Sequence, residues 1–392
     1  MKARYLEPAI EGDVKDKMVF LGGPRQVGKT TLAQAIAARF KASTYLNWDS
    51  RSHRRAILNA QWSPDAEMLV FDELHKYRRW KNLIKGIWDT RPPNQKIMVT
   101  GSSRLDIYRR GGDSLQGRYH YYRLHPFSLR EMSEPGGLAS EFPREPPHLE
   151  FARTSPDLAH LLEFGGFPEP CLAGNQRTLK RWQRQRFERV FREDIRDVEP
   201  VRSLSEVELL GAMLPERIAS PLSFNSLATD LEVSPKTVKA WIELLCRNYY
   251  AFRVPPYHRR LQRALKKEAK YYLWDWSEVP GDGARFENLV ASHLLKFCHH
   301  FQDVFGVAVD LFYLRDLEKR EADFLLTWER NPWLIVECKL AAGGSLTALN
   351  YFADRLKIKQ RFLVVREEDV DHVNRATGIR ALSANRFLAA LV

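Results

Sequence analysis

Ten residues near the start of the chain combine glycine, lysine and threonine at a spacing that suits a polyphosphate. Residues 22–31 read GGPRQVGKTT and contain the pattern G-x-x-x-x-G-K-T. In such a loop the backbone N–H groups surround the phosphates, the lysine reaches the β- and γ-phosphates, and the threonine hydroxyl holds Mg²⁺. We therefore predict a site for ATP and Mg²⁺. Its nucleotide-binding residues are Gly23, Pro24, Arg25, Gln26, Val27, Gly28, Lys29, Thr30 and Thr31.

A second segment supplies the carboxylates that this chemistry needs. The apolar residues 68–71 are followed by Asp72 and Glu73. The apolar run predicts a buried strand, and the carboxyl ends of strands are where open α/β sheets place their ligands. We expect Asp72 to bind Mg²⁺ together with Thr30, and Glu73 to polarise the attacking water.

Two further segments could complete a hydrolytic site. A third predicted strand, 96–104, has a polar end that resembles the third-strand sensor of AAA+-like ATPases. There Ser102 or Ser103 would contact the γ-phosphate or the attacking water; a helix cap or turn is the alternative role. The glycine-containing stretch 111–118 ends in Arg118, which suits an arginine that stabilises charge in a neighbouring subunit. The other candidates for this role are Arg104, Arg109 and Arg110, and each of the four could equally be a surface arginine.

These chemical groups need a strand, a loop and a helix in that order. Residues 18–21 are apolar and suit a buried strand, and residues 31–40 are rich in helix formers. This order aims the amino end of a helix at the phosphates. The stretch 134–149 is rich in proline and glycine and predicts a linker, after which residues 150–218 are expected to form a helical lid.

The middle of the chain carries a helix-turn-helix pattern over residues 223–245. Ser234 is expected to cap the second helix, with Pro235 at its first position. Residues 248–254 could form a wing. The predicted buried stripe is Val238, Trp241, Ile242 and Leu245, and the residues near the exposed amino end are Lys236, Thr237 and Lys239. Direct contact with DNA and a purely structural role both remain open.

Acidic residues and a lysine recur near the carboxyl end. A predicted helix, 284–295, carries Glu287, and predicted strands carry Asp323 and the pair Glu337 and Lys339. Residues 337 and 339 share one face of a strand because strand side chains alternate. The carboxylates would bind Mg²⁺, and Lys339 would position or activate water beside it. This is the pattern of a PD-(D/E)xK nuclease, although Glu-x-Lys also arises by chance and cleavage is left open.

Together these segments resemble a prokaryotic family of AAA+-like ATPases fused to a PD-(D/E)xK nuclease-like domain. The resemblance covers nearly the whole chain and rests on residues 23–30, 71–76, 100–103, 115–118, 164–169 and 191–195. It implies an α/β protein with a P-loop AAA+-like core (1–133), a linker and helical lid (134–218), a winged helix-turn-helix (219–256) and a nuclease-like domain (257–392). His75 stands where the family usually has glutamine.

The composition of the chain indicates which classes of partner it can bind. The 392 residues carry a formal net charge of +12, with basic clusters at 177–196 and 259–270. This charge favours polyanions, nucleic acid first, although a basic helix can also be a solvated surface. The four cysteines form no C-x-x-C pair, which argues against a structural zinc site. No apolar run reaches the roughly 18–20 residues that span a membrane, and we expect a cytoplasmic protein.

Two function hypotheses follow from these observations. In the first, the chain is an ATPase that remodels duplex or branched DNA as a homo-oligomeric ring, such as a hexamer, and uses its last domain to bind or cut the DNA. In the second, it is a nucleotide-dependent switch or scaffold that binds protein partners and neither moves nor cuts DNA. Stimulation of ATP hydrolysis by DNA separates the two hypotheses.

Overall fold

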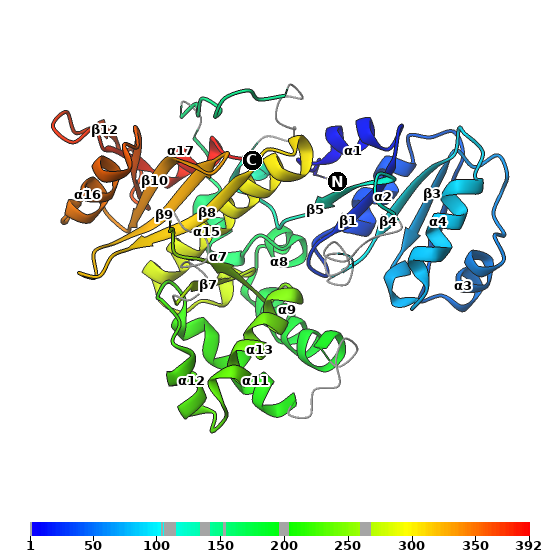
Figure 1. Cartoon of the computed structure of the whole chain (residues 1–392), viewed down its shortest axis with the longest axis horizontal. Coiled ribbons are helices and arrows are strands. Elements are labelled where there is room, and N and C mark those ends of the chain that lie inside the picture. The colour runs from blue at the N-terminus through cyan, green and yellow to red at the C-terminus, as the bar shows by residue number, and fades with distance from the viewer. Residues whose placement is uncertain are drawn as a thin grey trace. The chain divides into compact units, whose positions relative to one another are not determined.

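The chain forms two units, each with its own sheet. The computed structural model describes residues 2–102, 105, 115–133, 142–151, 154–195, 204–258 and 268–392. One unit comprises the described residues up to Pro126, and the other begins at Phe127, ahead of the predicted domain boundary at residue 133. The second unit therefore contains the predicted lid, helix-turn-helix and carboxyl-terminal segments together (Figure 1).

The first unit is built on a parallel sheet of five strands. The strands are β1 (Met18–Gly22), β2 (Ser43–Asn47), β3 (Met68–Asp72), β4 (Lys96–Thr100) and β5 (Tyr119–Arg123). Their order is β2-β3-β4-β1-β5, and every pairing is parallel. All carboxyl ends therefore meet at one edge of the sheet. The predicted strands at 18–21 and 68–71 are confirmed, and the third predicted strand, 96–104, ends earlier, at Thr100.

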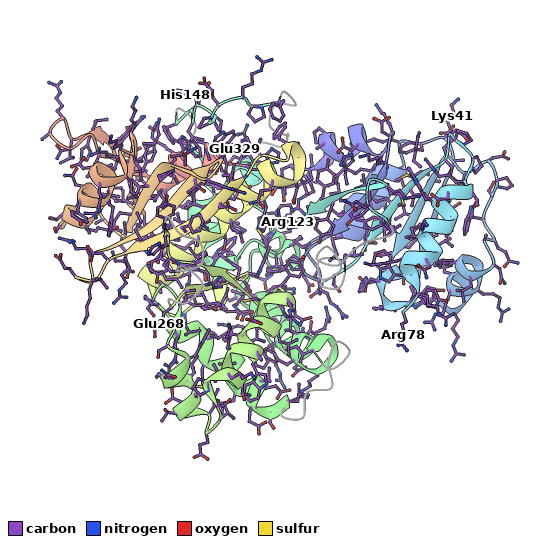
Figure 2. The ribbon with its side chains drawn as sticks, viewed as in Figure 1. Lys41, Arg78, Arg123, His148, Glu268 and Glu329 are labelled. Carbon is purple, nitrogen blue, oxygen red and sulfur yellow. The ribbon has the colours of Figure 1, made fainter. Side chains whose placement is uncertain are left out.

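Helices surround this sheet and bury its apolar residues. They are α1 (Glu7–Asp13), α2 (Lys29–Ala37), α3 (Arg51–Leu58), the 3-10 helix η1 (Leu74–Lys76) and α4 (Trp80–Thr90). The core includes Phe20 of β1, Phe71 of β3 and Val99 of β4, packed with Trp80 and Ile84 of α4. Figure 2 shows Lys41, which precedes β2, and Arg78, which follows β3, at opposite ends of this unit.

The second unit begins with helices. They are α6 (Leu129–Ser133), α7 (Leu158–Phe164), α8 (Pro168–Ala173), α9 (Gln176–Arg189), the π-helix η3 (Val190–Ile195), α11 (Leu204–Met213) and the 3-10 helix η4 (Leu214–Arg217). Four basic residues lie exposed along α9: Arg177, Lys180, Arg181 and Arg184.

Arg186 does not belong to this exposed basic face, because its side chain is buried. Its guanidinium donates to the Glu278 carboxylate at 2.9 Å and to the Tyr249 carbonyl at 3.1 Å. Glu278 ends the 3-10 helix η5 (Trp276–Glu278). Arg186 thus joins α9 to the segment that precedes the carboxyl-terminal sheet, and it is unavailable to a phosphate.

Two helices and a hairpin follow the first helical group. They are α12 (Phe224–Asp230), α13 (Pro235–Arg247), β6 (Ala251–Val254) and β7 (Lys270–Leu273), and β6 pairs with β7 in antiparallel fashion. The predicted cap is confirmed, because the Ser234 hydroxyl accepts from the Thr237 N–H at 3.1 Å. The predicted stripe of Val238, Trp241, Ile242 and Leu245 is buried.

A mixed sheet of six strands closes the chain. Its order is β12-β13-β11-β10-β9-β8. Strands β8, β9 and β10 are antiparallel, whereas β10, β11 and β13 are parallel. The elements are α15 (Asp282–His300), the π-helix η6 (Phe301–Phe305), β8 (Val309–Arg315), β9 (Glu321–Trp328), β10 (Asn331–Lys339), α16 (Thr347–Leu356), β11 (Gln360–Val365), β12 (Asp371–Val373), β13 (Arg380–Ser383) and α17 (Ala384–Ala389).

Helices cover this sheet. Leu349 and Phe352 of α16 pack on Leu325 of β9, Ile335 of β10 and Leu363 of β11, while α15 packs against β8 and β10. The predicted helix at 284–295 and the predicted strands that carry Asp323 and Glu337 are confirmed. Among the described residues, no helix is both long and apolar enough to cross a membrane.

Candidate active site

The glycine-rich loop joins β1 to α2, and two of its glycines are required by geometry. Gly28 precedes α2 with φ of 99°, a left-handed conformation that other residues adopt with strain. Gly23 has φ of 140°, and a Cβ there would lie 2.4 Å from the Leu124 carbonyl oxygen. The loop therefore closes tightly at the carboxyl edge of the sheet, where the amino end of α2 favours an anion.

Lys29, the first residue of α2, is folded back into this loop. Its side chain is buried, and its ammonium donates to the carbonyl oxygens of Gly23 at 3.0 Å and Pro24 at 2.6 Å. The positive charge thus lies within the loop itself. A phosphate entering the loop would meet this charge together with the backbone N–H groups.

Asp72, at the end of β3, accepts hydrogen bonds from three hydroxyls. Thr30 Oγ1 donates to Oδ2 at 2.8 Å, Tyr45 OH donates to the same oxygen at 2.6 Å, and Thr100 Oγ1 donates to Oδ1. The Asp72 side chain is buried. Burial and the hydrogen bond to Asp72 raise the pKa of Tyr45 to about 12, so Tyr45 remains a donor at neutral pH.

The pair Thr30 and Asp72 fits a magnesium ion. Mg²⁺ prefers oxygen ligands and is commonly held by one or two carboxylates with a hydroxyl from the phosphate loop. A hydroxyl and a carboxylate oxygen already meet here at 2.8 Å. The loop lies directly beside them, since Thr30 follows Lys29.

Tyr45 and Thr100 were not predicted as site residues. Tyr45 lies near the carboxyl end of β2, and Thr100 is the last residue of β4, opposite Asp72 in the sheet register. A polar residue that ends an apolar strand beside the acidic strand is a signal that the sequence did contain. Recognising it requires the strand order, which brings β2 and β4 to either side of β3.

Glu73 has an unusual backbone conformation. Its φ is 57° and its ψ is 21°, in the left-handed region, and its N–H donates to the Thr100 carbonyl at 3.0 Å. Such a conformation costs about 1–3 kcal/mol in a residue other than glycine and is concentrated at functional sites. The Glu73 carboxylate lies 3.3 Å from the Lys76 ammonium and 3.7 Å from His75 Nε2.

His75 lies in η1, beside Glu73, and Ser102 follows the end of β4. His75 is buried, and its ring packs so closely that a Cβ on Gly101 would lie 2.3 Å from Nδ1. Ser102 is also buried. Ser103 lies outside the described residues, as do the other arginines that were candidates to act on a neighbouring subunit, Arg104, Arg109 and Arg110.

Arg4 is a further residue that sequence reasoning missed. Its buried guanidinium donates to the Val27 carbonyl in the loop at 2.8 Å and to the His125 carbonyl that follows β5. The amino-terminal segment thereby ties the phosphate loop to the end of β5, whose last residue, Arg123, is labelled in Figure 2.

Arg118 lies at the opposite edge of the sheet from these residues. It directly precedes β5, and its Nε donates to Asp89 of α4 at 2.9 Å, which lowers the pKa of that carboxyl. A strand of five residues spans about 16 Å, so the guanidinium is remote from the loop of its own chain. The structure brings Lys29, Thr30, Asp72, Glu73 and Ser102 together and separates Arg118 from them.

A second group of carboxylates surrounds a lysine in the other unit. Lys270 begins β7 and is fully buried. Its Nζ lies 2.8 Å from Glu321 Oε1, 3.1 Å from Glu287 Oε1 and 3.3 Å from Asp323 Oδ1. Lys270 is the last residue of the basic cluster 259–270, and its burial shows that this residue is not part of an exposed basic surface. Neither Lys270 nor Glu321 was predicted as a site residue.

The remaining predicted residues of this group have other contacts. Pairing of Val336 with Phe324 brings Glu337 of β10 beside Asp323 of β9. Glu337 Oε2 is buried and has no hydrogen-bond partner in the described structure. The Lys339 ammonium donates to the carbonyl oxygens of Gly343 at 3.3 Å and Ser345 at 2.9 Å.

Burial sets the protonation of this second group. It raises the pKa of Glu287 to about 7 and that of Glu337 to about 8, and the charge of Asp323 adds to both shifts. Burial alone would lower the pKa of Lys270, but Glu287, Asp323 and Glu321 outweigh it and raise that pKa. The ammonium therefore stays charged, and the predicted carboxylates Glu287 and Asp323 share it.

Three family models match successive parts of the chain. A family model described as an AAA domain matches residues 15–133. The first unit carries an AAA-like P-loop ATPase domain. Two models described as domains of unknown function, DUF8612 and DUF4143, match residues 155–277 and 282–387. An uncharacterized protein of Methanocaldococcus jannaschii is 23% identical over 395 residues, 95% of this chain and 84% of the relative.

Three solved structures are similar to parts of the chain. The Walker-type ATPase PabY2304 of Pyrococcus abyssi is 16% identical with a TM-score of 0.42, and the match covers 70% of this chain and 93% of that ATPase. AMPPCP-bound DnaA from Aquifex aeolicus is 12% identical with a TM-score of 0.31, covering 61% and 85%. RuvB from Thermotoga maritima is 17% identical with a TM-score of 0.30, covering 67% and 92%. Because all three TM-scores are below 0.5, the assignment of the AAA-like P-loop domain rests on the family match and on the five-stranded parallel sheet.

Proposed function

We propose that this protein is a Mg²⁺-dependent ATPase that assembles as a homo-oligomeric ring and couples hydrolysis to DNA binding or remodelling. The observation that carries the ATPase part is the contact between Thr30 of the phosphate loop and Asp72 of β3, at 2.8 Å, beside the inward-folded Lys29. These three side chains supply the ammonium, hydroxyl and carboxylate that a site for ATP and Mg²⁺ uses, which supports the proposal.

Each residue has a defined task in this proposal. Lys29 exchanges its bonds to the loop carbonyls for the β- and γ-phosphates. Thr30 and Asp72 would hold Mg²⁺, which supplies charge neutralisation on the phosphate oxygens. Glu73 orients the attacking water. The hydroxyls of Tyr45 and Thr100 hold the Asp72 carboxylate in place, and Arg118 acts on the nucleotide of a neighbouring subunit.

The DNA part is supported by charge. The chain carries a net charge of +12. On α9, each of four exposed basic residues has another three or four positions away, so they form one stripe (Arg177, Lys180, Arg181 and Arg184). Lys236 and Lys239 are exposed near the amino end of α13, the second helix of the helix-turn-helix pattern. Such groups neutralise phosphates and release counterions.

The proposed role of the last domain is to bind DNA with a nuclease-like fold. Its element order is one helix, three antiparallel strands, a second helix and a parallel strand, α15-β8-β9-β10-α16-β11. Asp323 lies on the second of these strands, and Glu337 and Lys339 end the third. This placement agrees with the sequence pattern of a PD-(D/E)xK domain.

The proposal is tested by measuring phosphate release with Mg²⁺-ATP alone and with duplex, single-stranded or branched DNA. We expect at least one DNA form to bind and to raise the rate. If no DNA form binds or stimulates while ATP is hydrolysed, the protein is instead a nucleotide-dependent switch or scaffold for protein partners.

The Lys29→Ala variant is the control for the site itself. Removing the Lys29 ammonium should lower the turnover rate by at least about 100-fold, because this charge would contact the transferred phosphoryl group. Circular dichroism and thermal unfolding of the variant should show that the folded state persists, since the hydrogen bonds of Lys29 to Gly23 and Pro24 lie within the loop. Full turnover in this variant would overturn the assignment of the loop.

A further inference from the structure

The carboxylate cluster of the last domain contains its own cation. We propose that the Lys270 ammonium is the resident counterion of Glu287, Glu321 and Asp323, and that it takes the place of the divalent metal that the sequence pattern implies. This inference goes beyond the proposed function, because it does not depend on ATP hydrolysis or on DNA as the partner.

The contacts of Lys270 use its full donor capacity. A lysine ammonium has three N–H donors, and three carboxylates lie within 3.3 Å of Nζ. They come from two elements, because Glu287 lies on α15 whereas Glu321 and Asp323 lie on β9. Lys270 itself is at 0% exposure. A charge buried this deeply persists only when it is paired and hydrogen-bonded.

The oxygens of Glu287 and Asp323 that face Lys270 are occupied by protein donors, whereas Glu337 Oε2 beside them has none. Glu287 Oε1 accepts from Lys270 and also from the Tyr272 hydroxyl at 2.7 Å. Asp323 Oδ1 faces Lys270, and Asp323 Oδ2 accepts from the Cys338 N–H at 2.9 Å. Mg²⁺ binds oxygens at about 2.1 Å, so an ion on these carboxylates would lie against the ammonium and be repelled by it.

The lysine of the sequence pattern is also committed elsewhere. Lys339 donates to the carbonyls of Gly343 and Ser345, and a Cβ on Gly344 would lie 3.0 Å from its Nζ. Within the described residues, no group of three or more histidine, cysteine, aspartate or glutamate side chains is arranged to hold a metal ion. The residues present therefore do not fit the metal, and we infer that this domain binds its partner without metal-dependent cleavage.

The experiment measures Mn²⁺ binding by electron paramagnetic resonance in the full-length chain. Asp72→Asn is introduced first as the background, so that the ATPase site loses its metal ligand. The background protein should bind no Mn²⁺ at millimolar concentration. Adding Lys270→Met should create one Mn²⁺ site per chain. The matched control, Lys359→Met, replaces an exposed lysine and should change nothing.

Thermal unfolding gives a second readout on the same proteins. In EDTA, Lys270→Met should unfold several degrees below the background, because removing one partner of a buried ion group leaves uncompensated charge. Mn²⁺ should restore much of that loss. A Lys270→Met variant that is as stable as the background in EDTA and binds no Mn²⁺ would overturn the proposal.

The decisive contrary result requires no lysine variant. If the background protein, with Lys270 intact, binds one Mn²⁺ and loses it on Asp323→Asn or Glu337→Gln, the site is a metal site and the proposal is wrong. This measurement also decides the matter if Lys270→Met fails to fold, since absence of Mn²⁺ binding with Lys270 intact then supports the resident ammonium.

Discussion

The two carboxylate sites of this chain have opposite kinds of neighbours. The Asp72 carboxylate accepts from three neutral hydroxyls, those of Thr30, Tyr45 and Thr100. The Asp323 carboxylate, in the other unit, faces the fixed ammonium of Lys270. Both carboxylates are well shielded from water, yet only the second has its charge compensated by a cationic side chain at hydrogen-bond distance.

The difference shows how a protein leaves a place for an ion. Hydroxyls satisfy the hydrogen-bonding capacity of a carboxylate without cancelling its charge, so the field at the oxygens still attracts a cation. An ammonium satisfies the hydrogen-bonding capacity of a carboxylate and also compensates its charge. A carboxylate motif read from sequence therefore predicts a metal site only when the fold supplies neutral donors around it, as it does for Asp72.

The largest expected contrast comes from matched substitutions at the two sites. Asp72→Asn should lower the rate of ATP hydrolysis by about 100-fold or more, because the charge that attracts Mg²⁺ is lost while the shape is kept. Asp323→Asn should leave that rate within about twofold. The measurement is steady-state phosphate release at saturating Mg²⁺-ATP. Equal losses in both variants would show that the two sites are not separate.

A smaller effect is expected from the hydroxyls around Asp72. Tyr45→Phe and Thr100→Val each remove one hydrogen bond to a charged group, worth about 1.5 kcal/mol, and should lower turnover about tenfold. Raising the Mg²⁺ concentration should recover part of the rate, since the carboxylate keeps its charge. A loss as large as that of Asp72→Asn would mean that these residues contact the reacting groups directly.

The sequence predicted the strands and the loop that bring Thr30 to Asp72, because that information is local. Lys29 and Thr30 are adjacent, and Asp72 and Glu73 end one apolar run, so spacing alone places them at one sheet edge. The cap of α13 by Ser234 is local in the same way.

The second site could not be read in this way. Lys270 lies 17 residues before Glu287 and 53 before Asp323, in a stretch that looks like a basic surface. Its burial depends on the pairing of β7 with β6 and on the packing of α15, which no short pattern encodes. The burial of Arg186 inside an apparently basic helix has the same origin, because its partner, Glu278, lies on a distant segment.

The smallest expected effect uses a third buried carboxylate. Burial raises the pKa of Glu278 to about 7, although Arg186 lowers it. The folded state then holds a proton that the unfolded state releases near pH 4.5, so this group's contribution to stability falls as the pH rises from about 4.5 to about 7.

Unfolding temperatures at pH 5 and pH 7.5 test this expectation. The parent should lose stability relative to Glu278→Gln as the pH rises. Parallel pH curves for the two proteins would show that Arg186 keeps Glu278 ionised throughout, and that a cationic partner alone decides the charge of a buried acid in this domain.

The position of Arg118 has a consequence for how activity depends on dilution. Its ion pair with Asp89 is partly exposed, and exposed ion pairs contribute little to stability. Under the proposed function, this guanidinium is the group that reaches the nucleotide of a neighbouring chain. If hydrolysis needs that donated arginine, a solitary chain loads ATP and holds it. Specific activity then rises with protein concentration, and the chain acts as a sensor of its own local abundance.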